Sequence, residues 1–123
     1  MRFSYQRDMI YKSVCKVDTH PTAADVFKMV HPYIKNISMG TIYRNLSQLA
    51  ENNMIIEINI NGITHYDGNI SSHQHFVCNE CGSIFDCHTQ NNWNTDIVQK
   101  INEYDIQDID IIFSGLCQKC KLN

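Results

Sequence analysis

The stretch that decides the fold is His73-Gln74-His75-Phe76-Val77-Cys78-Asn79-Glu80-Cys81, which carries two kinds of metal ligand side by side. Cys78 and Cys81 have the C-x-x-C spacing of a zinc knuckle, in which two thiolates on a tight turn reach one ion. His73 and His75 are two residues apart, so on an extended strand both imidazoles lie on one face and can share a second ion. The stretch therefore predicts a structural metal site beside an exchangeable one.

A second C-x-x-C near the end of the chain, Cys117 to Cys120, supplies the other half of a four-thiolate site. Tetrahedral zinc sites of four cysteines are closed and structural, so we expect this ion to hold a small domain together. The alternatives are two unrelated turns, or a thiol-redox protein that uses its C-x-x-C pairs enzymatically. The redox reading is disfavoured because neither pair precedes a helix in a βαβ unit.

Length and composition limit the class of protein. With 123 residues, 43% hydrophobic and 19% charged, the chain is predicted to be globular, either one ordinary domain or two small ones. It has neither a long apolar run nor a signal-peptide core, so we expect a cytoplasmic protein without a membrane span. Thiols stay reduced in that compartment, and six cysteines there indicate metal binding. Cys15 and Cys87 are expected to be small buried residues.

Charge is divided unevenly between the two halves of the chain. Residues 1–66 hold seven Lys or Arg against five acids, whereas residues 67–123 hold three Lys against eight acids. Such asymmetry suggests different partners for the two halves. The basic half could face phosphates, and bound cations would offset part of the charge of the acidic half.

Hydrophobic spacing and caps predict three helices in the first half. The first covers residues 4–17. The second follows Thr22, a predicted N-cap with an acid, Asp25, three residues later. The third runs from the cap Ser38 to about residue 52. Its predicted buried stripe is Met39, Ile42, Tyr43, Leu46, Leu49 and Ala50, and its outward or sideways residues are Arg44, Asn45, Ser47, Gln48 and Glu51.

A β-hairpin is predicted after these helices. Residues 54–60 are β-branched and alternate from Ile56 onward, Asn61-Gly62 suits a type I′ turn, and residues 63–67 form the return strand. Helices followed by such a hairpin predict a winged helix-turn-helix, whose third helix enters the major groove. The alternative for the third helix is an amphipathic helix with a solvated face, because winged helices also bind proteins. The residues expected to contact DNA are Arg7, Ser38, Thr41, Tyr43, Arg44 and Asn45.

The polar segment 68–72 is the predicted linker, and the second half is predicted to be a small α/β domain. We expect strands at residues 73–78 and 83–87, a helix over 91–104 and a strand within 105–113. Asp67 and Asp86 lie near the paired histidines in this arrangement. A two-histidine strand is a weak motif by itself, so from spacing alone a second metal site stays open. His31, His65 and His88 show no pattern.

Across nearly its whole length the chain resembles the ferric uptake regulator family. The resemblance runs through Gln6-Arg7, His20-Pro21-Thr22-Ala23, Gly40-Thr41-Ile42-Tyr43-Arg44-Asn45-Leu46, Tyr66-Asp67, the stretch from His73 to Gly82, and Gly115-Leu116-Cys117-Gln118-Lys119-Cys120. It implies an α+β regulator rather than an enzyme: a winged-helix DNA-binding domain at 1–67, a hinge at 68–72 and a dimerisation and metal-binding domain at 73–123. Its partners would be double-stranded operator DNA and a second copy of the chain.

The resemblance also implies the ligands of the second site. The family's regulatory metal, Fe²⁺ or Mn²⁺, falls here on His20, Asp67, His73, His75 and Asp86, and the structural zinc falls on Cys78, Cys81, Cys117 and Cys120. Such an ion could clamp the two halves and so make DNA binding depend on metal.

Within the family the chain is most similar to the peroxide-responsive repressors, which carry Asp at both carboxylate positions. Those proteins lose DNA when iron-catalysed oxidation modifies a ligand histidine, here His73 or His20. The alternative is a repressor of the same fold that senses the availability of iron or manganese.

Overall fold

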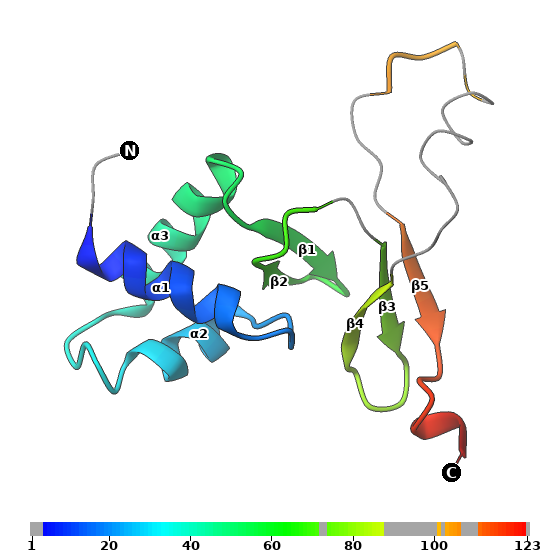
Figure 1. Cartoon of the computed structure of the whole chain (residues 1–123), viewed down its shortest axis with the longest axis horizontal. Coiled ribbons are helices and arrows are strands. Elements are labelled where there is room, and N and C mark those ends of the chain that lie inside the picture. The colour runs from blue at the N-terminus through cyan, green and yellow to red at the C-terminus, as the bar shows by residue number, and fades with distance from the viewer. Residues whose placement is uncertain (1–3, 72–73, 88–100, 102, 107–110, 123) are drawn as a thin grey trace. The chain divides into compact units, whose positions relative to one another are not determined.

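The computed structural model describes residues 4–71, 74–87, 101, 103–106 and 111–122. The chain divides into two compact units, residues 1–71 and 72–123 (Figure 1). The division falls at the end of segment 68–72, where a linker is expected.

Each helix of the N-terminal unit begins at a capped residue. Helix α1 (Tyr5–Lys16) begins after Ser4, whose hydroxyl accepts the backbone N–H of Arg7 at 3.3 Å. Helix α2 (Ala23–Val30) begins with a complete capping box between Thr22 and Asp25, with hydrogen bonds of 3.0 and 3.2 Å. Helix α3 (Met39–Glu51) follows Ser38. Such caps satisfy backbone donors that have no partner within the helix. The predicted caps Thr22 and Ser38 are confirmed.

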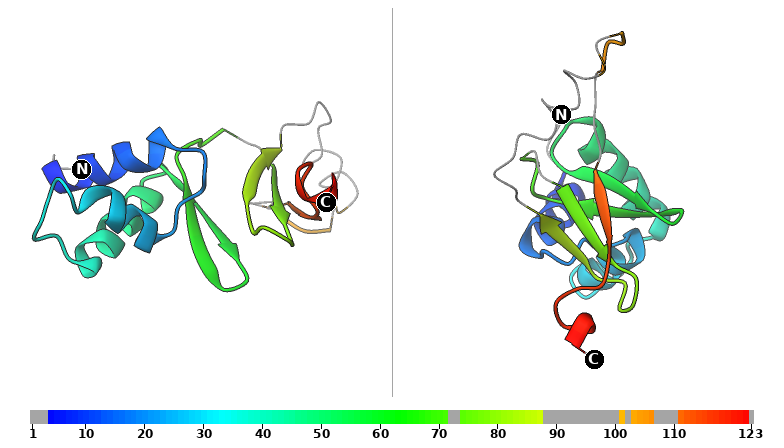
Figure 2. Two further views of the ribbon diagram at one scale, coloured as in Figure 1. Left: turned by 90° about the horizontal axis from the view of Figure 1, so that it is seen from below. Right: turned by 90° about the vertical axis from the view of Figure 1, so that its right-hand side faces the viewer.

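The three helices lie against one another (Figure 2). Their apolar side chains form one core. Its largest fully buried side chains come from all three helices: Ile10, Val14, Val26, Val30, Ile42, Leu46 and Leu49. Residues spaced three and four apart lie on one side of a helix, so each helix contributes a continuous apolar stripe. Burying one such Val, Leu or Ile side chain contributes about 1.5–3 kcal/mol.

Strands β1 (Ile56–Ile60) and β2 (Ile63–Asp67) form an antiparallel hairpin, as expected. Asn61 and Gly62 connect them with φ angles of 53° and 82°, the two positive values that a type I′ turn requires. The register places Asp67 opposite Ile56 and His65 opposite Ile58. At the other end of β2, Gly68 lies against α1: a Cβ there would be 2.8 Å from the Cα of Cys15.

In the C-terminal unit the described strands form one sheet in the order β4-β3-β5 (Figure 2). Strand β3 (Gln74–Cys78) pairs antiparallel with β4 (Ile84–Cys87) and parallel with β5 (Ile112–Gly115). A short 3₁₀ helix, η1 (Cys120–Leu122), ends the described chain. The central strand is thus paired on both sides, and its last residue, Cys78, is fully buried.

Some expectations need correction. Cys15, expected to be buried, is exposed, and Cys87, also expected to be buried, is only partly buried. Tyr43, expected in the buried stripe of α3, is 54% exposed, whereas Asn45, expected to face outward or sideways, is 7% exposed. The amide of Asn45 donates to the carbonyl of Thr41 at 2.8 Å, which satisfies a buried polar group within its own helix.

The strand expected within 105–113 also lies later in the chain. Residues 105–106 are not in a strand, and β5 continues to Gly115 because it pairs with β3 as far as Cys78. The helix expected at 91–104 falls mostly outside the described residues, and the residues described there, 101, 103 and 104, are not helical.

Candidate metal centres

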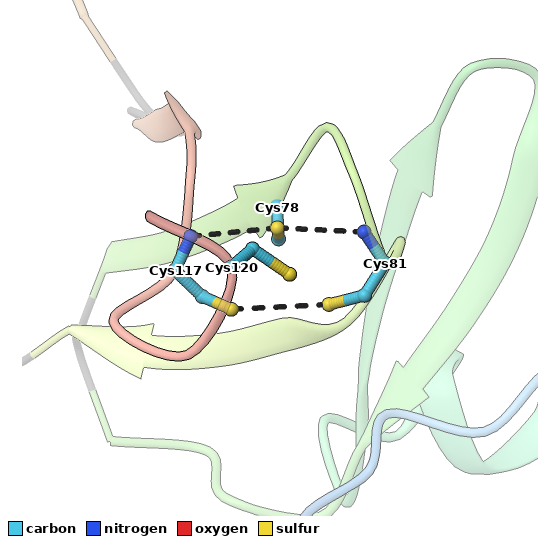
Figure 3. A group of neighbouring side chains, drawn as sticks. All are labelled: Cys78, Cys81, Cys117 and Cys120. Carbon is cyan, nitrogen blue, oxygen red and sulfur yellow. Dashed lines mark hydrogen bonds between the residues drawn. The ribbon is translucent and has the colours of Figure 1, made fainter. Parts of the chain in front are cut away.

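Four cysteines from two turns of the C-terminal unit meet in one cluster (Figure 3). Cys78 ends β3, Cys81 lies in the following turn, Cys117 follows β5 and Cys120 begins η1. Their sulfur atoms all lie within 4.8 Å of one another. The pairing of β3 with β5 brings the two C-x-x-C motifs together, although they are far apart in the sequence.

The spacing of the sulfur atoms fits a tetrahedral ion. Zinc–sulfur bonds of about 2.3 Å in a tetrahedron separate neighbouring sulfurs by about 3.8 Å. The Sγ atoms of Cys81 and Cys117 are 3.9 Å apart. Four thiolates are the ligand set of closed, structural zinc sites, so the cluster fits that ion in both chemistry and size.

Hydrogen bonds prepare this cluster to carry negative charge. Backbone N–H groups of Cys81 and Cys117 donate to the sulfur of Cys78 at 3.5 and 3.4 Å, and they lower the pKa of that thiol to about 6. Hydrogen bonds with Ser83 lower the pKa of Cys81. By contrast, the hydrogen bond with the thiol of Cys117 raises the pKa of Cys120 to about 12. The four thiols therefore do not all lose their protons easily, because neighbouring thiolates would repel one another. A bound cation would offset the repulsion between thiolates, and its binding would release the remaining protons.

A histidine–aspartate pair lies in the N-terminal unit. Nε2 of His20 is 3.3 Å from Oδ2 of Asp67, and both residues are buried. Oδ1 of Asp67 accepts the backbone N–H of Asn69 at 2.9 Å. His20 has a φ of 56°, in the left-handed region that few residues other than glycine adopt. An unusual backbone conformation at a buried polar pair is typical of functional sites.

Strand β2 holds this segment in place. The backbone N–H of Tyr66 donates to the carbonyl of Pro21 at 2.8 Å, and Thr22 forms an antiparallel bridge with His65. Nδ1 of His65 lies 2.7 Å from the carbonyl oxygen of His20. His65 had no assigned role from the sequence. Its position two residues before Asp67 on one strand was a usable signal, because such residues lie on the same face.

A second histidine–aspartate pair lies in the C-terminal unit. Nε2 of His75 is 3.4 Å from Oδ1 of Asp86, and the two residues are directly opposite each other on β3 and β4. His75 is buried and Asp86 is partly buried. Imidazole and carboxylate groups are suitable ligands for Fe²⁺ and Mn²⁺, so each pair offers ligand atoms of the kind expected for the regulatory ion. His73, the remaining expected ligand, lies outside the described residues.

The residues expected to contact DNA gather mainly at the start of α3. The hydroxyls of Ser38 and Thr41 are 3.0 Å apart, and the guanidinium of Arg44 donates to the hydroxyl of Thr41 at 3.4 Å. Tyr43 and Arg44 are exposed. Arg7 belongs to α1 and is partly buried, and Asn45 is buried. Among the described residues, no helix has the length and apolar character that a membrane span requires.

An α+β chain with a four-cysteine cluster and two histidine–aspartate pairs has the features of a metal-binding protein. The model of the Ferric uptake regulator family matches residues 1–114, and the chain belongs to that family. It is accordingly a metal-responsive regulator of this family.

Individual relatives include the peroxide-responsive repressor PerR of Staphylococcus epidermidis, 28% identical over 98% of this chain and 82% of its own length. PerR of Staphylococcus aureus strain USA300 is also 28% identical, over 98% of this chain and 83% of its own.

Among solved structures, the Campylobacter jejuni peroxide stress regulator is similar with a TM-score of 0.79 and 28% identity, over 94% of this chain and 88% of its own. The Helicobacter pylori ferric uptake regulator Fur gives a TM-score of 0.84 at 22% identity, over 98% of this chain and 83% of its own. The second likeness bears on the fold alone.

Proposed function

We propose that this protein is a metal-dependent, DNA-binding transcriptional repressor that senses hydrogen peroxide through oxidation of a ligand histidine. The observation that carries the proposal is the histidine–aspartate pair in each unit, His20 with Asp67 and His75 with Asp86. Both carboxylates are aspartates, as in the peroxide-responsive members that the sequence resembles. The 28% identity to PerR of Staphylococcus epidermidis supports the same subgroup.

In this proposal the two pairs and His73 bind one regulatory ion, Fe²⁺ or Mn²⁺. His20 and Asp67 belong to the N-terminal unit, whereas His75 and Asp86 belong to the C-terminal unit. An ion that prefers the arrangement in which both pairs contribute ligands would shift the population toward it. DNA affinity would then depend on metal because the ion binds the DNA-binding arrangement of the two units more tightly than other arrangements.

The N-terminal unit would bind operator DNA as a winged helix. Helix α3 would enter the major groove, and the hairpin β1–β2 would form the wing. Arg44 carries a guanidinium suited to guanine edges or phosphate, and exposed Tyr43 could reach a thymine methyl or a phosphate. Ser38 and Thr41 lie beside Arg44, whereas Arg7 would contribute from α1. Asn45 is the weakest member of the proposed set, because its amide is engaged with Thr41.

The C-terminal unit would bind zinc through its four cysteines and would form the homodimer. Large apolar side chains of this unit are 43–51% exposed, at Phe85 in β4, at Ile112 in β5 and at Leu116 directly after β5. Phe85 and Leu116 line the same hollow of this unit together with Phe76, and contiguous exposed apolar side chains are typical of an interaction surface. Zinc would connect β3 to the end of the chain and so stabilise the surface that a second copy covers. Residues 68–72 would serve as the hinge.

Oxidation would release the repressor by removing a ligand. A ferrous ion held by the proposed histidine and aspartate ligands would supply the redox chemistry that activates peroxide. The net change on the protein is the insertion of one peroxide oxygen into a carbon–hydrogen bond of an imidazole, while the other oxygen leaves as water. An oxidised ring of His20 or His73 would bind metal poorly, and the population would shift away from the DNA-binding arrangement. Each protein molecule would be oxidised once and not regenerated, so the reaction would serve sensing and not enzymatic turnover.

Mass spectrometry of the iron-loaded protein after brief peroxide treatment tests this proposal. Trypsin releases residues 17–28, which contain His20 as their single histidine, and cleavage after glutamate releases residues 58–80, which contain His73. We expect one added oxygen on His20 or His73 in the Fe²⁺ protein and none in the Mn²⁺ protein. His31, exposed and outside the proposed ligand set, is the matched control for non-specific oxidation. Unmodified His20 and His73, or equal modification of His31, would contradict the proposal.

DNA binding is measured in parallel by fluorescence anisotropy, with duplexes selected by the Mn²⁺-loaded protein from a random pool. His20→Ala should leave a folded protein whose DNA affinity no longer responds to metal. Metal-dependent DNA binding by that variant would remove His20 from the regulatory site.

A second candidate function is sensing of iron or manganese availability, because imidazole and carboxylate ligands suit both ions. In that case chelation would release DNA, whereas peroxide would neither release DNA nor modify a histidine.

A further inference from the structure

We infer that His65 is a positioning residue for the proposed regulatory site, holding the backbone of His20 so that its imidazole faces Asp67. The inference rests on the proposed function, because it concerns the same ligands. His65 belongs neither to the proposed ligand set nor to the residues expected to contact DNA.

The contact that carries this inference joins β2 to the segment before α2. Nδ1 of His65 lies 2.7 Å from the carbonyl oxygen of His20. A carbonyl oxygen only accepts hydrogen bonds, so Nδ1 of His65 must carry the hydrogen. The bond joins a side chain to the backbone of a residue 45 positions earlier, and it is partly buried from water.

The backbone of His20 needs such support. Its φ of 56° lies in the left-handed region, where a residue with a side chain persists only if its surroundings hold it. The next peptide groups are held by the same strand, through the hydrogen bond from Tyr66 to Pro21 and the bridge between Thr22 and His65. His65 extends this row of contacts to His20 itself.

Strand β2 thereby determines the positions of both His20 and Asp67. His65 holds the carbonyl of His20, and Asp67, two residues further along the same strand, places its carboxylate 3.3 Å from the His20 ring. Loss of the His65 hydrogen bond should let the backbone of His20 leave its left-handed conformation, which would turn the imidazole away from Asp67. Partners that orient metal ligands in this way typically change metal affinity by about 10- to 100-fold.

The test compares His65→Phe, which keeps a ring but lacks the donor, with His65→Asn, whose amide offers an N–H near the position of Nδ1. Manganese affinity of the full chain is measured by electron paramagnetic resonance of free Mn²⁺, and zinc content by elemental analysis. We expect His65→Phe to weaken Mn²⁺ binding at least tenfold, or about 1.4 kcal/mol. His65→Asn should restore most of the affinity, and zinc content should stay unchanged in both variants.

The visible spectrum of Co²⁺ bound at saturation separates positioning from general stability. A change in ligand geometry should alter the spectrum of His65→Phe but not that of His65→Asn. His31→Phe is the matched control, because His31 also belongs to the N-terminal unit but packs against Phe27, with ring centres 5.1 Å apart. Its affinity and spectrum should match those of the original protein.

The possible outcomes separate the two proposals. If the original protein binds no Mn²⁺ or Co²⁺ beyond its cysteine site, the proposed function fails. If it binds them and His65→Phe binds equally well with the same spectrum, the role of His65 is refuted. Should His65→Phe fail to fold, His65→Val takes its place, since valine suits a strand and also lacks a donor. Equal affinity in His65→Val would refute the role as well.

Discussion

Replacement of Gly68 by alanine tests how closely the end of the hairpin is packed against α1. An ideal Cβ at Gly68 would lie 2.8 Å from the Cα and 2.9 Å from the Sγ of Cys15. Ordinary contacts between carbon atoms are about 3.5–4.0 Å long, so the two segments would have to separate by at least about 0.7 Å. The nearest obstacle is backbone, which cannot rotate away as a side chain can.

The expected loss of stability follows from two opposing effects. Added atoms in a tightly packed region typically cost about 1–3 kcal/mol. The smaller conformational freedom of alanine in the unfolded chain returns about 0.4–1 kcal/mol, because the φ of Gly68 is not among the positive values. Gly68→Ala should therefore lower the free energy of unfolding of the N-terminal unit by about 1–2 kcal/mol.

Urea unfolding followed by far-ultraviolet circular dichroism measures this change, since α1, α2 and α3 all lie in the N-terminal unit. Gly40→Ala is the matched control: its Cβ would meet only the hydroxyl of Ser38, at 3.8 Å, and should cause no loss. Cys15→Ala combined with Gly68→Ala should recover only part of the loss, because the contact with the Cα of Cys15 remains. A Gly68→Ala variant as stable as Gly40→Ala would refute the reasoning.

Three further substitutions have clear expected results. Thr22→Ala should lower the free energy of unfolding of the N-terminal unit by about 1 kcal/mol, because the capping box is lost, while Thr22→Ser should retain most of it in the same urea assay. Asn45→Asp places an acceptor against the carbonyl of Thr41 and should cost about 1–3 kcal/mol in that assay, and an unchanged midpoint would contradict the buried hydrogen bond. Cys117→Ser should lose zinc by elemental analysis and unfold or monomerise the C-terminal unit, whereas a stable zinc-bound dimer would argue against the four-cysteine site.

The elements that could be predicted from the sequence are those set by interactions between near neighbours. Ser4, Thr22 and Ser38 cap their helices through residues three positions away, so a short sequence contains both partners. The turn at Asn61 and Gly62 follows in the same way from two residues that tolerate positive φ.

Periodicity was less reliable at the edges of α3. It predicted the buried stripe through Ile42, Leu46 and Leu49, which is confirmed. It placed Tyr43 inside and Asn45 outside, and both placements are wrong. Packing against other elements decides whether a residue at the border of the apolar stripe is buried or exposed. A polar residue can be buried there when its own helix offers a hydrogen-bond acceptor, as the carbonyl of Thr41 does for Asn45.

In the metal centres, too, local features could be predicted from the sequence and long-range contacts could not. The C-x-x-C spacing is local and predicts a pair of thiolates at each turn, and the sequence therefore identified all four cysteines of the cluster. Their meeting depends on the parallel pairing of β3 with β5, which the sequence pattern did not contain.

The stretch from His73 to Cys81 thus identified by itself one pair of thiolate ligands and two candidate imidazole ligands, because ligand type and spacing are properties of neighbouring residues. Tertiary structure decided which partners these ligands and His20 have. His75 faces Asp86 through strand register, and His20 faces Asp67 because β2 holds a left-handed backbone through His65. Contacts between residues 45 positions apart form only when the chain folds, and no local pattern records them.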